Sequence, residues 1–168
     1  MSTRDPISGA VWHYTIGKWY PDIARDGFIK PATALISEGE RPVVWFSTNP
    51  VWEATVNKVW RNGDGTHIEL TKEQTAELGG GLVRVAVRRK TAPVTWAVFK
   101  RESGIDPNKA KELERTALVR FADPREWRCS WVAVPSDKWI AVETWKDGRW
   151  TELPIEGAVR VTPGRPSI

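Results

Sequence analysis

The order in which the apolar segments follow one another constrains the fold of this chain more than any other feature. An aromatic and β-branched run at residues 10–15 predicts a strand, and residues 19–25 predict a short helix. A second strand is expected at residues 41–47, followed by a helix that begins at Pro50. The C-terminal half is richer in strands, so the regular alternation of a doubly wound sheet is missing. The pattern predicts an α+β fold.

Turn signals and hydrophobic periodicity divide the remainder of the chain. Thr48 or Asn49 is placed to cap the helix at Pro50. The other expected elements are a turn at residues 62–65, a helical turn at 71–78, a glycine turn at 79–81, a strand at 82–88, helices at 94–102 and 107–121, and strands at 127–134, 139–145 and 149–153. The 107–121 helix is expected to bury one side, made of Leu113, Ala117, Leu118 and Phe121.

Length and composition favour one ordinary globular domain. The chain has 168 residues, of which 40% are apolar, and we expect a domain over residues 1–160 with a loose tail at 161–168. No apolar run approaches the ~20 residues that span a bilayer, and the N-terminus lacks the apolar stretch of a secretory signal. Cys129 is the single cysteine, which excludes an internal disulfide. These features predict a cytoplasmic protein without a membrane partner.

Tryptophan content and charge point to two kinds of ligand. Most of the eleven tryptophans are expected in the core, although some rings can line a pocket or stack on bases. The net charge of +4 is uneven, being −1 over residues 1–84 and +5 over residues 85–168. The cations include a local group made of Arg84, Arg88, Arg89, Lys90, Lys100 and Arg101. This group forms either a solvated face or a surface that binds a phosphate-bearing ligand or nucleic acid.

Several common sites are excluded by their missing motifs. The chain has no phosphate-binding loop of the G-x-x-x-x-G-K-[ST] type and no G-x-G-x-x-G. It also lacks the G-x-S-x-G elbow of a serine hydrolase. One cysteine and the two histidines, His13 and His67, are too few for a zinc site, so no metal is expected. His67 lies in a polar stretch and is expected to be an ordinary surface residue.

Two segments remain, and together they carry a resemblance. The first is Trp12-His13-Tyr14-Thr15 followed by the helix end and Gly-Phe-Ile-Lys-Pro at residues 23–31. The second, at residues 44–55, contains Phe46-Ser47-Thr48 and Ala54. In order and spacing these segments resemble the ADP-ribosyltransferase superfamily, in the branch of diphtheria-type toxins and poly-ADP-ribose polymerases. The resemblance covers about residues 11–58 and implies split mixed or antiparallel sheets flanked by short helices.

The resemblance also implies roles for individual residues around NAD. His13 would hydrogen-bond a ribose hydroxyl, the backbone of Tyr14 would hold the nicotinamide amide, and Thr15 would support the turn. Ser47 would lie beneath the nicotinamide ring. Of the two tyrosines with which the family clamps that ring, the first falls on Phe46 and the second on Asn57, which cannot stack. Nearby rings that can substitute are Tyr20, Trp45, Trp52 and Trp60.

The family's third element is a glutamate at the start of a later strand. Breaking the nicotinamide–ribose bond develops positive charge on the ribose, and a carboxylate ~4 Å away stabilises that charge by about 4 kcal/mol at an effective dielectric constant near 20. Glu126, at the start of the strand expected at residues 127–134, is the catalytic candidate beside His13. Glu143 and Glu114 are the reserves.

The resulting prediction is an NAD-dependent enzyme that transfers ADP-ribose to a macromolecule, either protein or nucleic acid. Three alternatives stay open. An RNA 2′-phosphotransferase of the same superfamily would grip phosphates with arginines such as Arg84, Arg88 and Arg128. A second alternative is a cleft that binds a nucleotide or peptide without cleaving it, and a third is a tryptophan-rich nucleic-acid binder.

Overall fold

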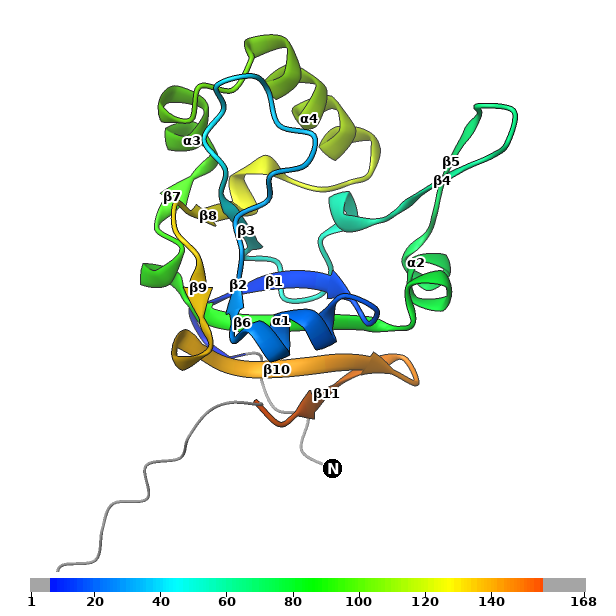
Figure 1. Cartoon of the computed structure of the whole chain (residues 1–168), viewed down its shortest axis with the longest axis vertical. Helices are drawn as coiled ribbons and strands as arrows, with labels where there is room; N and C mark the ends of the chain where they lie inside the picture. Colours follow the sequence, from blue (N-terminus) through cyan, green and yellow to red (C-terminus); the bar gives the residue numbers. More distant parts are fainter. Residues whose placement is uncertain (1–6, 156–168) are drawn as a thin grey trace, which may run out of the picture.

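The fold is built on a central antiparallel sheet that runs through the whole body of the molecule (Figure 1). The computed structural model describes residues 7–155, so the predicted tail at 161–168 and the end of the predicted domain lie outside the described residues. Within that range every strand pair is antiparallel. The strands in spatial order are β11 (Arg149–Leu153), β10 (Trp139–Lys146), β6 (Leu82–Arg88), β1 (Ala10–Ile16), β3 (Val44–Ser47), β8 (Trp127–Ser130) and β7 (Val94–Thr95).

The sheet consists of two halves that meet at a narrow junction. β11, β10, β6 and β1 form the platform half, in which β1 pairs with β6 over seven residues. β3, β8 and β7 form the cleft half. Between the halves, β1 and β3 share a single registered pair, Trp12 opposite Ser47. The two halves are therefore free to diverge beyond that pair.

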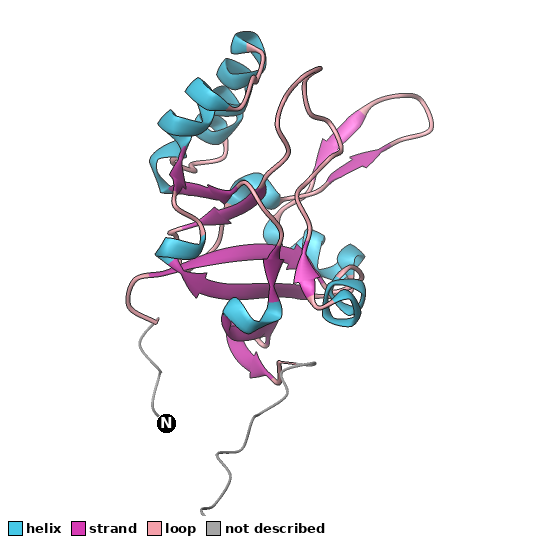
Figure 2. Ribbon diagram, turned by 60° about the vertical axis from the view of Figure 1, so that its left-hand side comes forward, coloured by secondary structure: helices cyan, strands magenta, loops and turns pink. Residues whose placement is uncertain are grey.

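Short helices and two small ladders surround the sheet (Figures 1 and 2). β2 pairs with β9 in one ladder, and β4 pairs with β5 in a hairpin that stands away from the body. These elements have the following bounds: α1 (Tyr20–Asp26), β2 (Phe28–Ile29), β4 (Val59–Arg61), β5 (His67–Glu69), α2 (Lys72–Gly79), α3 (Trp96–Glu102), α4 (Pro107–Val119) and β9 (Val134–Pro135). Four 3₁₀ turns complete the described part, at Ala54–Val56, Arg89–Thr91, Pro124–Glu126 and Ser136–Lys138. The result is the single-domain α+β fold that the element order predicts.

Three packed clusters hold the structure together. On one face of the platform half, small branched residues such as Val11, Val85 and Val142 pack beneath α1. On the opposite face lie Trp12 and Tyr14, covered by partly buried side chains from residues 50–57 and β11. The third cluster packs α3 and α4 against the cleft half and is rich in aromatic rings. Because successive strand residues point to opposite faces, each half of the sheet has a core on both sides.

The predicted helix at Pro50 is wrong. Asn49 accepts hydrogen bonds through Oδ1 from the backbone N–H groups of Val51 (2.9 Å) and Trp52 (3.4 Å), so it forms a local turn in place of a helix cap. The Pro50 carbonyl accepts from the Arg84 guanidinium and has no helical partner. Only a three-residue 3₁₀ turn follows, with Glu53 as its extended N-cap. Local side-chain bonds therefore replace the expected helix.

Several other boundaries differ from expectation. The strand expected at residues 41–47 begins at Val44, and residues 94–95 of the helix expected at 94–102 form β7. The predicted strand at residues 127–134 stops at Ser130, whose hydroxyl accepts from the Val132 N–H (3.2 Å) and donates to the Val132 carbonyl (2.8 Å). Helix α4 ends at Val119, and Phe121 adopts a left-handed φ of 58°. The expectation that Leu118 and Phe121 are buried is wrong. The end of the helix turns both side chains outward, so Leu118 is 76% exposed and Phe121 is 98% exposed.

Candidate functional site

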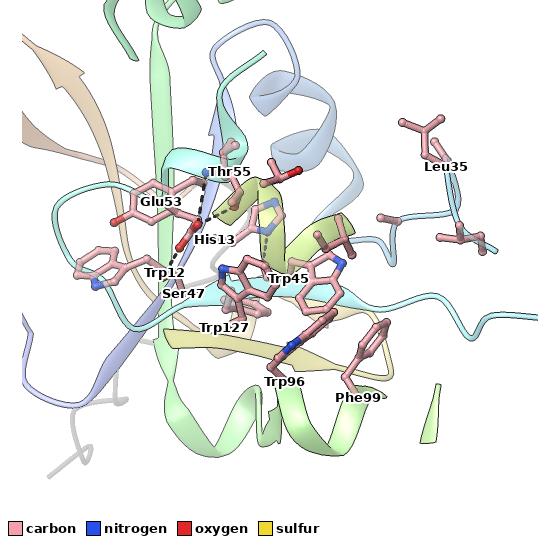
Figure 3. A pocket seen from close by; sticks show the side chains of 18 of the residues that line it. Trp12, His13, Leu35, Trp45, Ser47, Glu53, Thr55, Trp96, Phe99 and Trp127 are labelled. Carbon is pink, nitrogen blue, oxygen red and sulfur yellow. Dashed lines mark hydrogen bonds between the residues drawn. The ribbon is translucent and has the colours of Figure 1, made fainter. Parts of the chain in front are cut away.

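A cleft opens where the two halves of the sheet separate (Figure 3). It has a volume of about 320 Å³ and is lined by residues from β1, β3, the 32–40 segment, the 53–56 segment, α3 and α4. The β1 edge has no registered partner in β3 beyond Trp12. Its backbone groups at residues 13–16 are therefore not used by a β1–β3 ladder. A volume of this order suits part of a nucleotide-sized ligand.

His13 lies at the centre of the cleft, and its ring is held by a backbone bond. Nδ1 lies 2.8 Å from the Trp45 carbonyl oxygen. A carbonyl only accepts, so Nδ1 carries the hydrogen and Nε2 is left as an acceptor. Burial lowers the pKa of His13, an effect that the bond to Trp45 opposes and the charge of Lys58 reinforces. The imidazole is thus a neutral acceptor at neutral pH, suited to a hydroxyl donor such as that of a ribose.

Glu53 supplies a buried carboxylate to the same cleft. Its Oε2 accepts from the Ser47 hydroxyl (3.0 Å), and its Oε1 accepts from the Thr55 hydroxyl (2.6 Å) and the Thr55 N–H (3.4 Å). Glu53 is 6% exposed and forms no ion pair with any described residue. A positive charge that develops in the cleft would therefore meet a fixed negative charge.

One wall of the cleft is aromatic. Trp45 contacts the edge of Phe99 with ring centroids 4.7 Å apart, and Trp96 contacts Trp127 at 4.9 Å. Figure 3 shows these rings gathered below His13 and on the side away from Glu53. Their edge contacts leave ring surface facing the cleft, which suits a flat ligand ring.

Five of the predicted site residues line the cleft. They are His13, Tyr14, Trp45, Phe46 and Ser47. His13 and Phe46 come from neighbouring strands, and their rings touch edge to face at 5.7 Å. Ser47 uses its hydroxyl to bond Glu53. The Tyr14 hydroxyl donates to the Asn49 carbonyl (2.5 Å), and burial raises the pKa of Tyr14.

The other predicted contacts with the nicotinamide ring lie outside the lining. Thr15 is buried in β1 opposite Val83, and Tyr20 packs against the platform core. Asn57 accepts through Oδ1 from the Trp52 indole (3.0 Å). The two other rings that could replace the missing tyrosine also lie outside the lining. Trp52 packs on Tyr14 with ring centroids 5.1 Å apart, and Trp60 is exposed on β4.

The predicted catalytic carboxylate, Glu126, does not line the cleft. It ends the 3₁₀ turn before β8, where its backbone carbonyl accepts from Thr48. Burial raises the pKa of Glu126, and the neighbouring negative charges of Glu53 and Asp123 add to that rise. Of the reserves, Glu143 pairs with Arg84 at 2.5 Å. Glu114 accepts from the Trp96 indole and from Lys100, both at 2.7 Å.

Sequence reasoning missed Glu53, although the signal was available. It is the first carboxylate after the aromatic–serine step at residues 46–47, inside an otherwise aromatic and small-residue stretch. An acidic residue in such surroundings is either exposed or held by partners. The expectation of a helix at Pro50 concealed the second possibility.

The arginines considered for phosphate binding are not gathered at the cleft. Arg84 is buried on the platform half, bonded to Glu143, with its guanidinium 3.8 Å from the Trp12 ring centre. Arg88 is exposed at the end of β6. Arg128 donates to the Ala92 carbonyl at 3.2 Å. Lys109 is the one lysine or arginine among the cleft-lining residues, and it lies 3.7 Å from Glu40.

Within residues 7–155, no group of three or more potential ligand side chains is placed to hold a metal ion. The same residues contain no helix of the length and apolarity needed to cross a membrane. The chain matches no protein-family model, and neither a curated protein nor a solved structure shows a significant similarity to it. The function has to be argued from the cleft itself.

Proposed function

We propose that this protein binds NAD in the cleft, breaks the nicotinamide–ribose bond and transfers ADP-ribose to a macromolecule. One observation carries the proposal: the junction of the two sheet halves brings a neutral imidazole, aromatic rings and an unpaired buried carboxylate to one cavity. The strands of the two halves form one continuous sheet, and its single registered pair between β1 and β3 is the feature that supports the resemblance to a split sheet.

In this proposal the aromatic residues hold the nicotinamide ring. Phe46 and Trp45 lie beside His13, and Trp96 and Trp127 continue the wall. The nicotinamide of NAD is a flat cation, and aromatic faces attract cations as well as flat rings. The unpaired β1 edge next to Tyr14 would bond the amide of the nicotinamide. Nε2 of His13 would accept a hydrogen bond from a ribose hydroxyl and fix the sugar.

Glu53 takes the electrostatic part of the reaction. When the C1′–N bond breaks, its electron pair leaves with neutral nicotinamide and the ribose becomes a cation. A carboxylate that already lies in place stabilises this cation without reorganisation. An oxygen or nitrogen of the acceptor then bonds C1′ and loses its proton. Glu126, predicted for the electrostatic role, lies outside the cleft lining, so we assign that role to Glu53.

The test compares the two carboxylates in matched variants. Nicotinamide release and transfer of labelled ADP-ribose to a cell lysate are measured for the wild type, Glu53→Gln and Glu126→Gln. We expect Glu53→Gln to lose turnover by about 100-fold or more, the scale for removing one preorganised electrostatic group. Its NAD affinity, measured by thermal shift, should change much less. Glu126→Gln should retain most of the turnover.

Three outcomes would count against parts of this proposal. Absence of both NAD binding and nicotinamide release in the wild type would overturn the function. Loss of turnover in Glu126→Gln alone would return the catalytic role to Glu126. NAD binding without turnover would leave a non-catalytic nucleotide module. Thermal shift is sensitive enough, because NAD at a hundredfold its Kd adds about 2.7 kcal/mol of stability.

A further inference from the structure

The β4–β5 hairpin is an arm that begins at the cleft and ends in solvent. All six strand residues are exposed, and the arm stands away from the body in two views (Figures 1 and 2). Its root follows directly after Thr55 and Val56, which line the cleft. Arg120 fixes that root by pairing with Glu69 at 2.9 Å and donating to the Thr55 carbonyl at 3.3 Å. A ligand held on the arm would therefore be held at the cleft mouth.

One face of the arm carries an alternation of rings and charge. Trp60 lies opposite Ile68 across the hairpin. Lys58 precedes Trp60 by two residues, so both point to the same face. The Lys58 ammonium lies 4.1 Å from the centre of the Trp19 ring. We call these four residues the tryptophan stripe; Trp19 and Trp60 are each 52% exposed.

The cations of the arm are not paired with its carboxylates. Asp64 is engaged at the turn, where it accepts from the Thr66 N–H (2.9 Å) and hydroxyl (2.6 Å). Glu69 is engaged with Arg120. Lys58 and Arg61 form no ion pair with the described residues. Lys58, half-buried with its ammonium over the Trp19 ring, is therefore the cation of the stripe face, whereas Arg61 points to the opposite face of the arm.

We propose that the tryptophan stripe, with Lys58 as its cation, binds single-stranded nucleic acid. Exposed rings stack on unpaired bases of any sequence, and cations beside them contact the phosphates. A double helix hides its base faces, so a single strand fits the exposed rings of Trp19 and Trp60 better. Given the proposed function, which this step rests on, the bound strand is the ADP-ribose acceptor.

Binding of a labelled oligonucleotide tests the proposal without NAD. Fluorescence anisotropy is measured for single strands of about 20 nucleotides of DNA and RNA, which exceed the site size of one small domain. We expect Trp60→Ala to weaken binding by about 5- to 100-fold, as for loss of one stacked base. Lys58→Ala should reduce the slope of log affinity against log salt by about one phosphate contact.

Matched controls separate the stripe from other exposed residues. Phe121→Ala removes a fully exposed ring outside the stripe, and Arg89→Ala removes an exposed cation from the basic group near β6. Both should bind the oligonucleotide as the wild type does. Equal affinity of Trp60→Ala and wild type, or a loss confined to Arg89→Ala, would overturn the proposal. So would the absence of oligonucleotide binding at low salt, which would favour a protein acceptor.

A second measurement distinguishes this proposal from the proposed function. Trp60 does not line the cleft, so Trp60→Ala should keep wild-type nicotinamide release and the wild-type thermal shift with NAD. Stripe-dependent oligonucleotide binding in a protein that never cleaves NAD would end the proposed function alone. NAD cleavage with no dependence of oligonucleotide binding on the stripe would end this inference alone.

Discussion

The platform half and the cleft half of the sheet are made in different ways. In the platform half, strands of seven and eight residues pair in long ladders, and small branched side chains such as Val11, Val85 and Val87 fill the space without exposure. In the cleft half, strands of two and four residues carry large rings that meet edge to face. Branched residues on a regular sheet pack to high density, whereas large rings on short strands leave space. We therefore expect stability to be concentrated in the platform half, whereas the cavity lies at the cleft half.

The largest expected change in the free energy of unfolding comes from truncating a leucine in the platform half, compared with a leucine at the cleft. Leu82 is fully buried in β6, whereas Leu113 on α4 is half-buried and lines the cleft. We expect Leu82→Ala to cost about 3 kcal/mol, because the packed sheet cannot close the cavity, and Leu113→Ala to cost about 1 kcal/mol. Urea denaturation gives both values. Equal costs would show that the cleft wall is packed as tightly as the platform.

A smaller effect is expected at the polar pair of the platform half. Glu143→Gln leaves the Arg84 guanidinium buried without its counter-charge, although the Trp12 and Trp150 rings still face it. Removing one partner of a fully buried pair costs 3–5 kcal/mol, and Glu143 is one-fifth exposed, so we expect about 2 kcal/mol. The affinity for NAD that we propose for the cleft should not change. A changed affinity at unchanged stability would connect Glu143 to the cleft.

The platform half is also the part that the sequence describes best. The predicted strands at residues 10–15 and 82–88 match β1 and β6 within one residue, because their alternation and β-branched content act locally. Prediction fails where a side chain bonds the nearby backbone, as Asn49 and Ser130 do. It also misses the strands of the β4–β5 hairpin, since all six residues are exposed and show no buried face. Only its turn was predicted.

The candidate site likewise contains residues that the sequence predicts well and one that it does not. His13 and Phe46 lie side by side, as expected, because each belongs to a strand with a clear pattern. Glu53 enters the cleft only because Ser47 and Thr55 hold it in an irregular segment. The sequence signals a carboxylate that is either exposed or held by partners, but its entry into the cleft depends on contacts that the local pattern does not specify. Sequence reasoning therefore chose Glu126, which begins a recognisable strand.

Protonation of His13 gives a smaller effect that is specific to the cleft. Burial lowers the pKa of His13 below the ordinary value of 6.5, so the unfolded chain binds a proton there before the folded protein does. Stability should fall as the pH drops below about 6.5, by at most about 1.4 kcal/mol per pH unit, and should level off below the folded pKa. Above pH 6.5 this contribution is constant. Urea denaturation between pH 5 and 8 should show this fall in the wild type and a smaller fall in His13→Gln. Parallel curves would place the titration elsewhere.

The smallest expected effect concerns local opening of the cleft half, and Cys129 reports it. This thiol is fully buried in β8, and burial raises its pKa to about 12, so a thiol reagent reacts only after opening exposes it. Short strands and a neighbouring cavity should let the cleft half open without global unfolding. Labelling of Cys129 in native conditions should therefore report a free energy of local opening that is about 1 kcal/mol or more below the free energy of global unfolding measured in urea.

Two changes separate the two free energies. Leu82→Ala should lower the free energy of global unfolding and leave that of local opening nearly unchanged, whereas NAD, if it binds as proposed, should raise the free energy of local opening. If labelling reports the global free energy, the two halves open together, and the division between a stable platform and a mobile cleft fails.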